Sequence, residues 1–181
     1  MPPPSVRVFG ADEQTDVKVD VLRWIRLAEL VLREERVDAD AELSVLFVDE
    51  HSVAELNERF LDTEGPTDVL AFPIDDEAIV GRHPDQGGRG PGAPPDPVDA
   101  PLVIGDVVVC PSVARRQAQT YGRSLDDELA LLVVHGVLHL LRYDHAEPAD
   151  AARMRRREQE LLASFRADDA SRREPDEPST T

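Results

Sequence analysis

Apolar residues recur along the chain with two different periods, and these periods predict a mixture of strands and helices. Short segments that alternate apolar and polar residues, or that are rich in β-branched residues, predict strands. Longer segments with apolar residues three and four positions apart predict amphipathic helices. The predicted strands are 5–9, 42–48, 67–73 and 102–110, and the predicted helices are 17–35, 49–61, 111–121, 124–141 and 149–165. This order predicts a single α/β (α+β) domain with about four strands and five helices.

Two of these segments are more apolar than the others. The strand 102–110 is an almost continuous apolar run, which is typical of a strand buried on both faces. The helix that begins near Ser124 is apolar nearly all round from Leu129 to Leu141, which predicts a central, buried helix. Ser124 and the acids after it have the pattern of a capping box, and Gly122 is the predicted C-cap of the helix before it.

Two segments have the composition of chain that does not pack into a core. Residues 75–100 are rich in glycine and proline and carry two arginines against six acids, a local charge of −4. They are predicted to form a flexible loop inserted into the domain 1–165, and a passive insertion is favoured over a lid on an active site. Residues 166–181 are charged and are predicted to form a disordered C-terminal tail.

Composition restricts the class of protein further. The 181 residues contain one cysteine, Cys110, and no apolar run of 18 residues, and the N-terminus lacks an apolar segment of signal-peptide length. These features predict a soluble protein of a reducing cytoplasm with no membrane partner. The formal net charge of −17 argues against a surface that binds nucleic acid generally. Local basic runs in 109–124 and 151–157 are interpreted first as solvated helix faces.

The candidate chemistry lies at the end of the buried helix, where three of the five histidines fall within eleven residues. His135 and His139 are four residues apart, so on a helix they share one face about one turn apart. His145 follows six residues later, and it reaches the same place only if the chain leaves the helix and folds back. Three histidines with an open fourth position are the donor set of many catalytic zinc sites.

A single buried histidine is more often a hydrogen-bonded core residue than a metal ligand. Two unpaired imidazoles on an apolar helix are costly to bury, and a bound metal compensates that cost. The third histidine makes one metal ion the favoured interpretation, with zinc first and nickel, copper or iron as alternatives. Cys110 is a possible further ligand, but a small apolar residue at a strand end is the preferred interpretation of it.

The same histidine spacing occurs in metzincin proteases, where a glutamate after the first histidine acts as general base. The corresponding residue here is Gly136, which has no side chain to accept a proton. The sequence therefore argues against peptide cleavage by that mechanism. Asp144 and Glu147 can lie near a metal, but a helix cap or a partner of a ligand is the simpler role for each.

With histidines at 135, 139 and 145, the chain resembles the YbeY family of bacterial endoribonucleases and rRNA maturation factors. Residues 135–145 match its signature H-G-x-L-H-L-x-G-Y-D-H at every fixed position except one. Residues 56–57 together with 65–73 are similar to the family's segment L-N…P-T-D-V-L-S-F-P. Residues 104–109 are similar to its segment G-D-I-V-I. The matched blocks run from about 43 to 147 in the same order, so the resemblance covers the whole domain.

The resemblance implies a small α/β fold with a mixed sheet of about four strands and one zinc ion held by His135, His139 and His145. It also implies cleavage of single-stranded RNA, trimming of 16S rRNA at its 3′ end, and a part in quality control of the small ribosomal subunit. The implied partners are the 16S rRNA precursor, the small subunit and its assembly proteins, with no DNA.

Two positions depart from the family pattern. Arg142 stands where the family has a glycine, which would let the chain turn left-handed out of the helix. Either the arginine adopts that conformation at a cost of roughly 1–2 kcal/mol, or the turn differs from that of the family. Leu61 stands where the family often has an arginine suited to phosphate contact, and Arg59 points about 200° away from Leu61 on a helix. Arg142 and Arg59 are therefore only candidates for the positive charge that steadies a phosphate.

The favoured hypothesis is zinc-assisted hydrolysis of RNA phosphodiesters, with arginines stabilising the developing charge. Attack by water and attack by the neighbouring 2′-hydroxyl both stay open. Two alternatives from other classes are a ribosome assembly factor whose zinc is mainly structural, and a general zinc hydrolase of small substrates.

Overall fold

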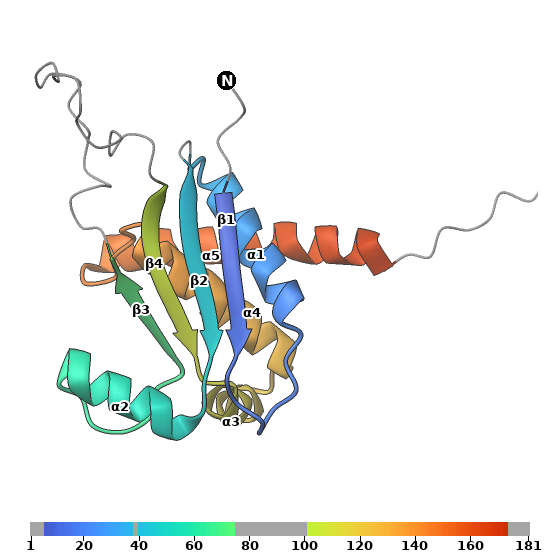
Figure 1. Cartoon of the computed structure of the whole chain (residues 1–181). Helices are drawn as coiled ribbons and strands as arrows, with labels where there is room; N and C mark the ends of the chain where they lie inside the picture. The colour runs from blue at the N-terminus through green and yellow to red at the C-terminus, as the bar shows by residue number, and fades with distance from the viewer. Residues whose placement is uncertain (1–5, 38–39, 75–100, 174–181) are drawn as a thin grey trace, which may run out of the picture.

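The structure is a computed structural model that describes residues 6–37, 40–74 and 101–173 (Figure 1). The predicted loop 75–100 and the last residues of the predicted tail, 174–181, lie outside this part of the chain. The elements follow in the order β1 (Val6–Asp12), α1 (Val21–Glu34), β2 (Ala41–Phe47), α2 (Glu50–Leu61), β3 (Val69–Pro73), β4 (Leu102–Val109), α3 (Pro111–Tyr121), α4 (Leu125–Leu140) and α5 (Pro148–Arg173).

The four strands form one mixed sheet in the order β1-β2-β4-β3, which confirms the predicted fold class (Figure 1). β1, β2 and β4 are parallel, and β3 runs antiparallel along β4 as an edge strand. The register of β2 against β4 shifts at Gly105, because Glu42 pairs with Val103 while Leu43 pairs with Gly105. Gly105 has φ +147°, and a Cβ there would lie 2.2 Å from the Phe72 carbonyl oxygen, so this irregularity needs glycine.

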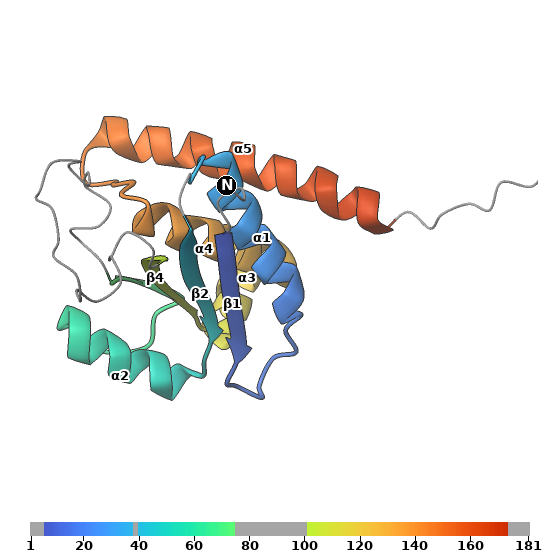
Figure 2. The same cartoon turned by 45° about the horizontal axis from the view of Figure 1, so that its top comes forward.

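Helices cover the two faces of the sheet unequally. α1 and α4 pack on one face, and α5 crosses them on the side away from the sheet (Figure 2). The larger core lies between these layers and includes Trp24, Phe47 and Leu138, each at most 1% exposed. A smaller apolar cluster on the opposite face joins β3 and β4 to α2 and the start of α3. Cys110 is fully buried in that smaller cluster, as expected of an apolar filler.

Local signals placed most helix ends correctly. The side chains of Asp49 and Ser124 accept hydrogen bonds from the backbone N–H groups of Ser52 and Asp127, and Gly122 ends α3 in the left-handed conformation. α1 begins at Val21 rather than near Val17. The buried side chain of Gln14 bonds both the N–H and the C=O of Val17, at 2.9 and 2.7 Å, which holds that residue in a turn.

The predicted start of the disordered tail at residue 166 is wrong for residues 166–173. α5 continues through them to Arg173 because ion pairs hold this last part of the helix to the domain. Asp169 bonds Arg23 of α1 at 3.1 Å, and Arg166 bonds Asp127 of α4 at 3.1 Å. No helix among the described residues is long and apolar enough to pass through a membrane.

α4 lies unusually close to the sheet at Gly136. A Cβ built there would meet Cγ1 of Val107 at 2.6 Å and Cγ2 of Val69 at 3.4 Å. Val107 is fully buried and β-branched, so its side chain has little freedom to move aside. The glycine thus has a packing role that is independent of any chemistry at the neighbouring histidine.

Gly136→Ala is expected to destabilise the protein by about 1 kcal/mol. Overpacking costs about 1–3 kcal/mol, and the better helix propensity of alanine returns about 1 kcal/mol of it. In a Val107→Ala background the clash is absent, so the same change is expected to stabilise. Urea denaturation of the four proteins measures both effects. Equal effects of Gly136→Ala in the two backgrounds would show that Val107 does not limit the approach of α4.

Candidate functional site

The last turn of α4 and the segment after it bring the three predicted histidines together. The imidazole centroids are 4.5 Å apart for His135 and His139, 4.9 Å for His139 and His145, and 6.1 Å for His135 and His145. The Nε2 atoms of His135 and His139 are 3.0 Å apart. The helix thus places two rings on one face, and the chain after it returns the third, as the spacing predicted.

The return depends on a left-handed residue at position 142. Arg142 has φ +71°, its N–H donates to the carbonyl of His139, and the N–H of Tyr143 donates to the carbonyl of Leu138, both at 3.0 Å. These two bonds form a Schellman motif, which usually has glycine at its left-handed position. Of the two alternatives at this position, the structure therefore has the left-handed turn, and an arginine adopts it.

A partly buried ion pair between α5 and the end of α1 holds the turn in place. The hydroxyl of Tyr143 donates to Oε2 of Glu35 at 2.9 Å, and Nε of Arg157 donates to Oε1 of the same carboxylate at 2.5 Å. Burial and the Glu35 carboxylate raise the pKa of the Tyr143 phenol, so it remains a donor. The turn is thereby tied to the C-terminus of α1 and to α5.

Asp144 shapes the segment that carries His145. Its Oδ1 accepts hydrogen bonds from the backbone N–H groups of His145, at 2.6 Å, and Ala146, at 3.0 Å. These bonds lower the pKa of the Asp144 carboxyl, which stays ionised. Glu147 precedes α5, and its carbonyl accepts from the N–H of Ala151 at 2.9 Å. Asp144 therefore has the simpler role expected for it, in the turn, while Glu147 takes part in the start of α5 through its backbone.

Glu158 is the one residue of the site that the sequence did not reveal. It lies on α5, is only 8% exposed, and has Oε1 2.7 Å from Nδ1 of His135. A carboxylate on Nδ1 holds that nitrogen as the donor and leaves Nε2 free on the opposite side of the ring. One feature of the sequence could have indicated Glu158 as a buried acid. It lies at helical spacing from the apolar residues that α5 turns toward the core, which are Met154, Leu161, Leu162 and Phe165.

The electrostatics of the cluster favour a neutral imidazole at His139. Burial is the largest cause that holds the pKa of His139 below its usual value, and the neighbouring rings of His135 and His145 lower it further. A neutral ring presents a lone pair, which is the form that binds a metal ion.

The histidines open into a hollow of about 460 Å³ at the outer edge of β3. Its wall is formed by Leu61, Val69, Leu70, Ala71, Pro73, His135, Gly136, His139, Leu140 and His145. Neither Arg59 nor Arg142 is among these residues. Arg59 instead places its guanidinium 5.3 Å from the centre of the Phe60 ring.

The donor atoms of the cluster do not yet surround a common point. In the described part of the chain, no three His, Cys, Asp or Glu side chains are arranged to hold a metal ion as they stand. Nε2 of His135 faces Nε2 of His139 at hydrogen-bond distance instead. The three histidine rings therefore lie close together, but their nitrogen atoms do not point to one common position.

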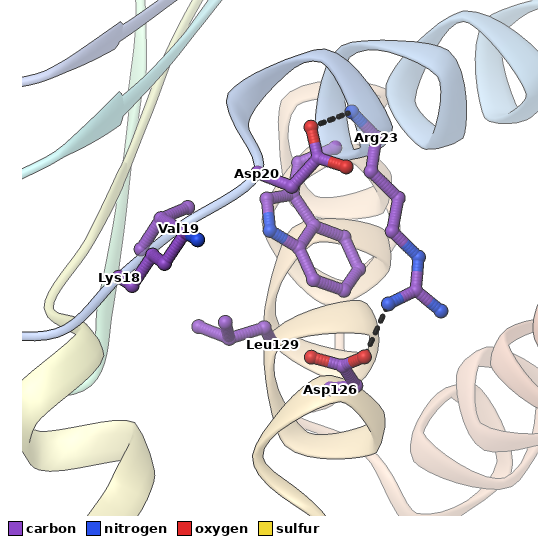
Figure 3. A pocket seen from close by; sticks show the side chains of 7 residues that line it. Lys18, Val19, Asp20, Arg23, Asp126 and Leu129 are labelled. Atoms are coloured by element: carbon purple, nitrogen blue, oxygen red, sulfur yellow. Dashed lines mark hydrogen bonds and ion pairs between the residues drawn. The ribbon is translucent and has the colours of Figure 1, made fainter.

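A second hollow, of about 270 Å³, lies at the opposite end of α4 (Figure 3). Arg23 forms an ion pair there with Asp126, and Asp20 caps the first turn of α1 through the N–H of Arg23 (Figure 3). Thirteen residues of helix separate Asp126 from His139, about 20 Å. Arg23 joins α1 to α4 and α5 here through Asp126 and Asp169, and the hollow is not part of the histidine site.

Comparison with known proteins identifies the family. The family model described as "Endoribonuclease YbeY" matches residues 10–166. The chain belongs to the YbeY family. It is 48% identical over 155 residues to "Endoribonuclease YbeY" of Acidothermus cellulolyticus, covering 86% of this chain and 89% of that protein. It is 47% identical over 158 residues to the protein of the same name from Salinispora tropica, covering 87% and 92%.

A solved structure supports the fold. The solution structure of the Thermotoga maritima protein TM1509 superposes with a TM-score of 0.56 and 23% identity, covering 98% of this chain and all of that one. The region matched by the YbeY model contains the three histidines, Glu158 and the residues that wall the hollow, so the site lies within the part of the chain that the family shares.

Arg142→Gly is expected to raise the free energy of unfolding by up to about 1 kcal/mol. Relief of the left-handed arginine is worth about 1–2 kcal/mol, and the greater freedom of glycine in the unfolded chain removes about half of it. Arg36 provides a matched control. It has φ +55° in the same motif at the end of α1, so Arg36→Gly should act alike.

Chemical denaturation of both variants measures these effects. Stabilisation by Arg36→Gly together with destabilisation by Arg142→Gly would show that the Arg142 side chain contributes more than its backbone strain costs.

Proposed function

We propose that this protein is a zinc-dependent endoribonuclease that cleaves single-stranded RNA. We further propose that it acts in the cytoplasm on the 3′ end of 16S rRNA and in quality control of the small ribosomal subunit. The family gives the activity class, an endoribonuclease that hydrolyses RNA. The observation that carries the proposal is the cluster of three imidazoles at the end of a buried helix beside an open hollow.

The residues present fit one zinc ion. Three neutral imidazoles are the donor set of many catalytic zinc sites. The 3.0 Å between the Nε2 atoms of His135 and His139 is close to the ~3.4 Å between two nitrogens bound to tetrahedral zinc. The carboxylate of Glu158 on Nδ1 of His135 is the partner that zinc-bound histidines commonly have. His135, His139 and His145 would hold the ion.

The chemistry follows from what surrounds the histidines. Bound zinc would supply a Lewis acid for a phosphoryl oxygen and lower the pKa of a water molecule. The wall that β3 and Leu140 form beside the histidines is largely apolar, and an apolar wall lowers the local polarity and strengthens electrostatic interactions at the phosphate. Arg142 and Arg59, both exposed near the ends of α4 and α2, would contribute positive charge toward the RNA backbone.

One observation favours a second candidate function. The residues that wall the hollow include no carboxylate to act as general base, and the hydrogen-bonded Asp144 is a weak base. A ribosome assembly factor whose zinc is mainly structural is therefore the alternative. Association with small-subunit precursors that survives loss of the histidines would favour it.

Zinc-loaded wild-type protein is expected to cleave single-stranded RNA, and His139→Ala should lose at least about 100-fold in rate because a ligand is removed. His145→Ala should lose activity and bound zinc together. His51→Ala is the matched control, since that imidazole is 82% exposed on α2. Gel analysis of an RNA oligonucleotide and metal analysis provide the two measurements.

The ends of the products separate the two chemical routes. A 2′,3′-cyclic phosphate indicates attack by the 2′-hydroxyl, and a 5′-phosphate indicates attack by water. Equal cleavage by the wild type and His139→Ala would contradict the nuclease proposal for this site.

Glu158→Gln is expected to weaken zinc binding about 10- to 100-fold, as loss of a carboxylate partner of a ligand typically does. Asp168→Asn is the control, because it removes the same charge elsewhere on α5. Competition with a chromophoric chelator measures the affinity. If both variants bind zinc as the wild type does, Glu158 has only a packing role.

A further inference from the structure

A third hollow, of about 410 Å³, lies on the sheet face opposite α4, beside the end of α2. Its volume is within the range of about 300–1,000 Å³ that small-molecule sites span. Its wall contains six apolar residues and one carboxylate, and these are Leu46, Leu56, Phe60, Phe72, Pro73, Val108 and Asp106. Nothing in the histidine chemistry accounts for this hollow.

Two aromatic rings form one side of it. Phe60 and Phe72 meet edge to face, with centroids 5.3 Å apart and planes at 62°. Phe60 is 56% exposed although it lies at the end of a helix that packs on this sheet. The hollow thus presents aromatic surface to solvent, and flat rings at such a place are suited to stack on a planar ligand.

A single acid provides a polar group beside these rings. Asp106 pairs directly with Phe72 across β3 and β4, so the two side chains lie next to each other on this face. The Asp106 carboxylate has no ion-pair or hydrogen-bond partner among the described residues. It is therefore available to accept hydrogen bonds from the N–H groups of a ligand.

This hollow adjoins the histidine hollow. Pro73 contributes to the wall of both, and the consecutive residues Phe60 and Leu61 wall one hollow each. β3 separates them, with Ala71 on the histidine side and Phe72 on the other. The guanidinium of Arg59, over the Phe60 ring, places positive charge at the rim. A polymer that leaves the histidines past the end of β3 would meet the aromatic hollow next.

We propose that this aromatic hollow binds one unpaired nucleobase of the RNA whose phosphate lies at the histidines, an inference that rests on the proposed function. The base would stack on Phe60 and Phe72, donate an N–H to Asp106, and leave its phosphate near Arg59. A paired base is not free to enter such a hollow, so the subsite also selects single-stranded RNA.

The test combines two changes, removal of the Phe60 ring from the protein and removal of the bases from the ligand. The binding affinity is measured for each combination in proteins that do not cleave. Every protein carries His139→Ala, and fluorescence anisotropy compares a short oligouridylate with a ribose-phosphate oligomer of the same length that lacks bases. Phe60→Ala is expected to weaken binding of the oligouridylate about fivefold or more, the lower end of base–aromatic stacking. Its effect on the oligomer without bases should be negligible.

Tyr121→Ala is the matched control. That ring is also exposed, at 65%, and an arginine, Arg123, lies 5.2 Å from its centre, but it belongs to α3. It should leave both affinities unchanged. Phe60→Leu keeps the apolar bulk without the aromatic face and should behave as Phe60→Ala does. Phe60 is exposed, and unchanged melting temperatures would exclude unfolding as the cause.

The outcomes separate this inference from the proposed function. Equal weakening of both oligomers by Phe60→Ala, no weakening of either, or full affinity in Phe60→Leu would overturn the nucleobase subsite even if the wild type cleaves RNA. Selective loss of the base-dependent affinity would support the subsite even if no cleavage were found.

Discussion

The close approach of α4 to the sheet is the contact on which the rest of the site depends. A backbone without a Cβ at Gly136 lets the helix lie against Val107 and Val69 more closely than any other residue would permit. His135 and His139 stand on either side of that glycine along the helix, so the same contact sets their distance from β3. The strand then becomes the wall of the hollow in which the histidines lie. Gly136 therefore determines both the packing of α4 on the sheet and the position of the candidate metal ligands.

The third histidine depends on a different kind of interaction. The Schellman motif at Arg142 reverses the chain, and the hydrogen-bonded group of Tyr143, Glu35 and Arg157 holds the reversed segment against α1 and α5. Glu158 of α5 then reaches back to His135. α5 thus stabilises both ends of the cluster, which gives a structural role to a helix that carries none of the predicted ligands.

Patterns of neighbouring residues predicted most helix ends of this protein. They failed at the end of α5, where residues distant in sequence determine the structure. The caps at Asp49, Gly122 and Ser124 depend on neighbours within three or four residues, and they were predicted at the correct positions. Helix geometry also required the chain to leave the helix between His139 and His145, whereas the left-handed conformation at residue 142 was suggested only by the glycine that the family has there. Residues 166–173 were assigned to a disordered tail because their composition is charged. Arg23 and Asp127, both distant in sequence, pair with Asp169 and Arg166 and keep them helical.

The sequence by itself determined the fold class, the buried helix and the three histidines, because each is encoded in the spacing of residues along one element. Only the tertiary structure revealed Glu158, the two hollows on either side of β3, and the placement of Arg59 over Phe60 rather than at the histidines. Those features join residues of different elements. A periodic pattern shows which face of an element is apolar, but not which side chains of another element will meet it there.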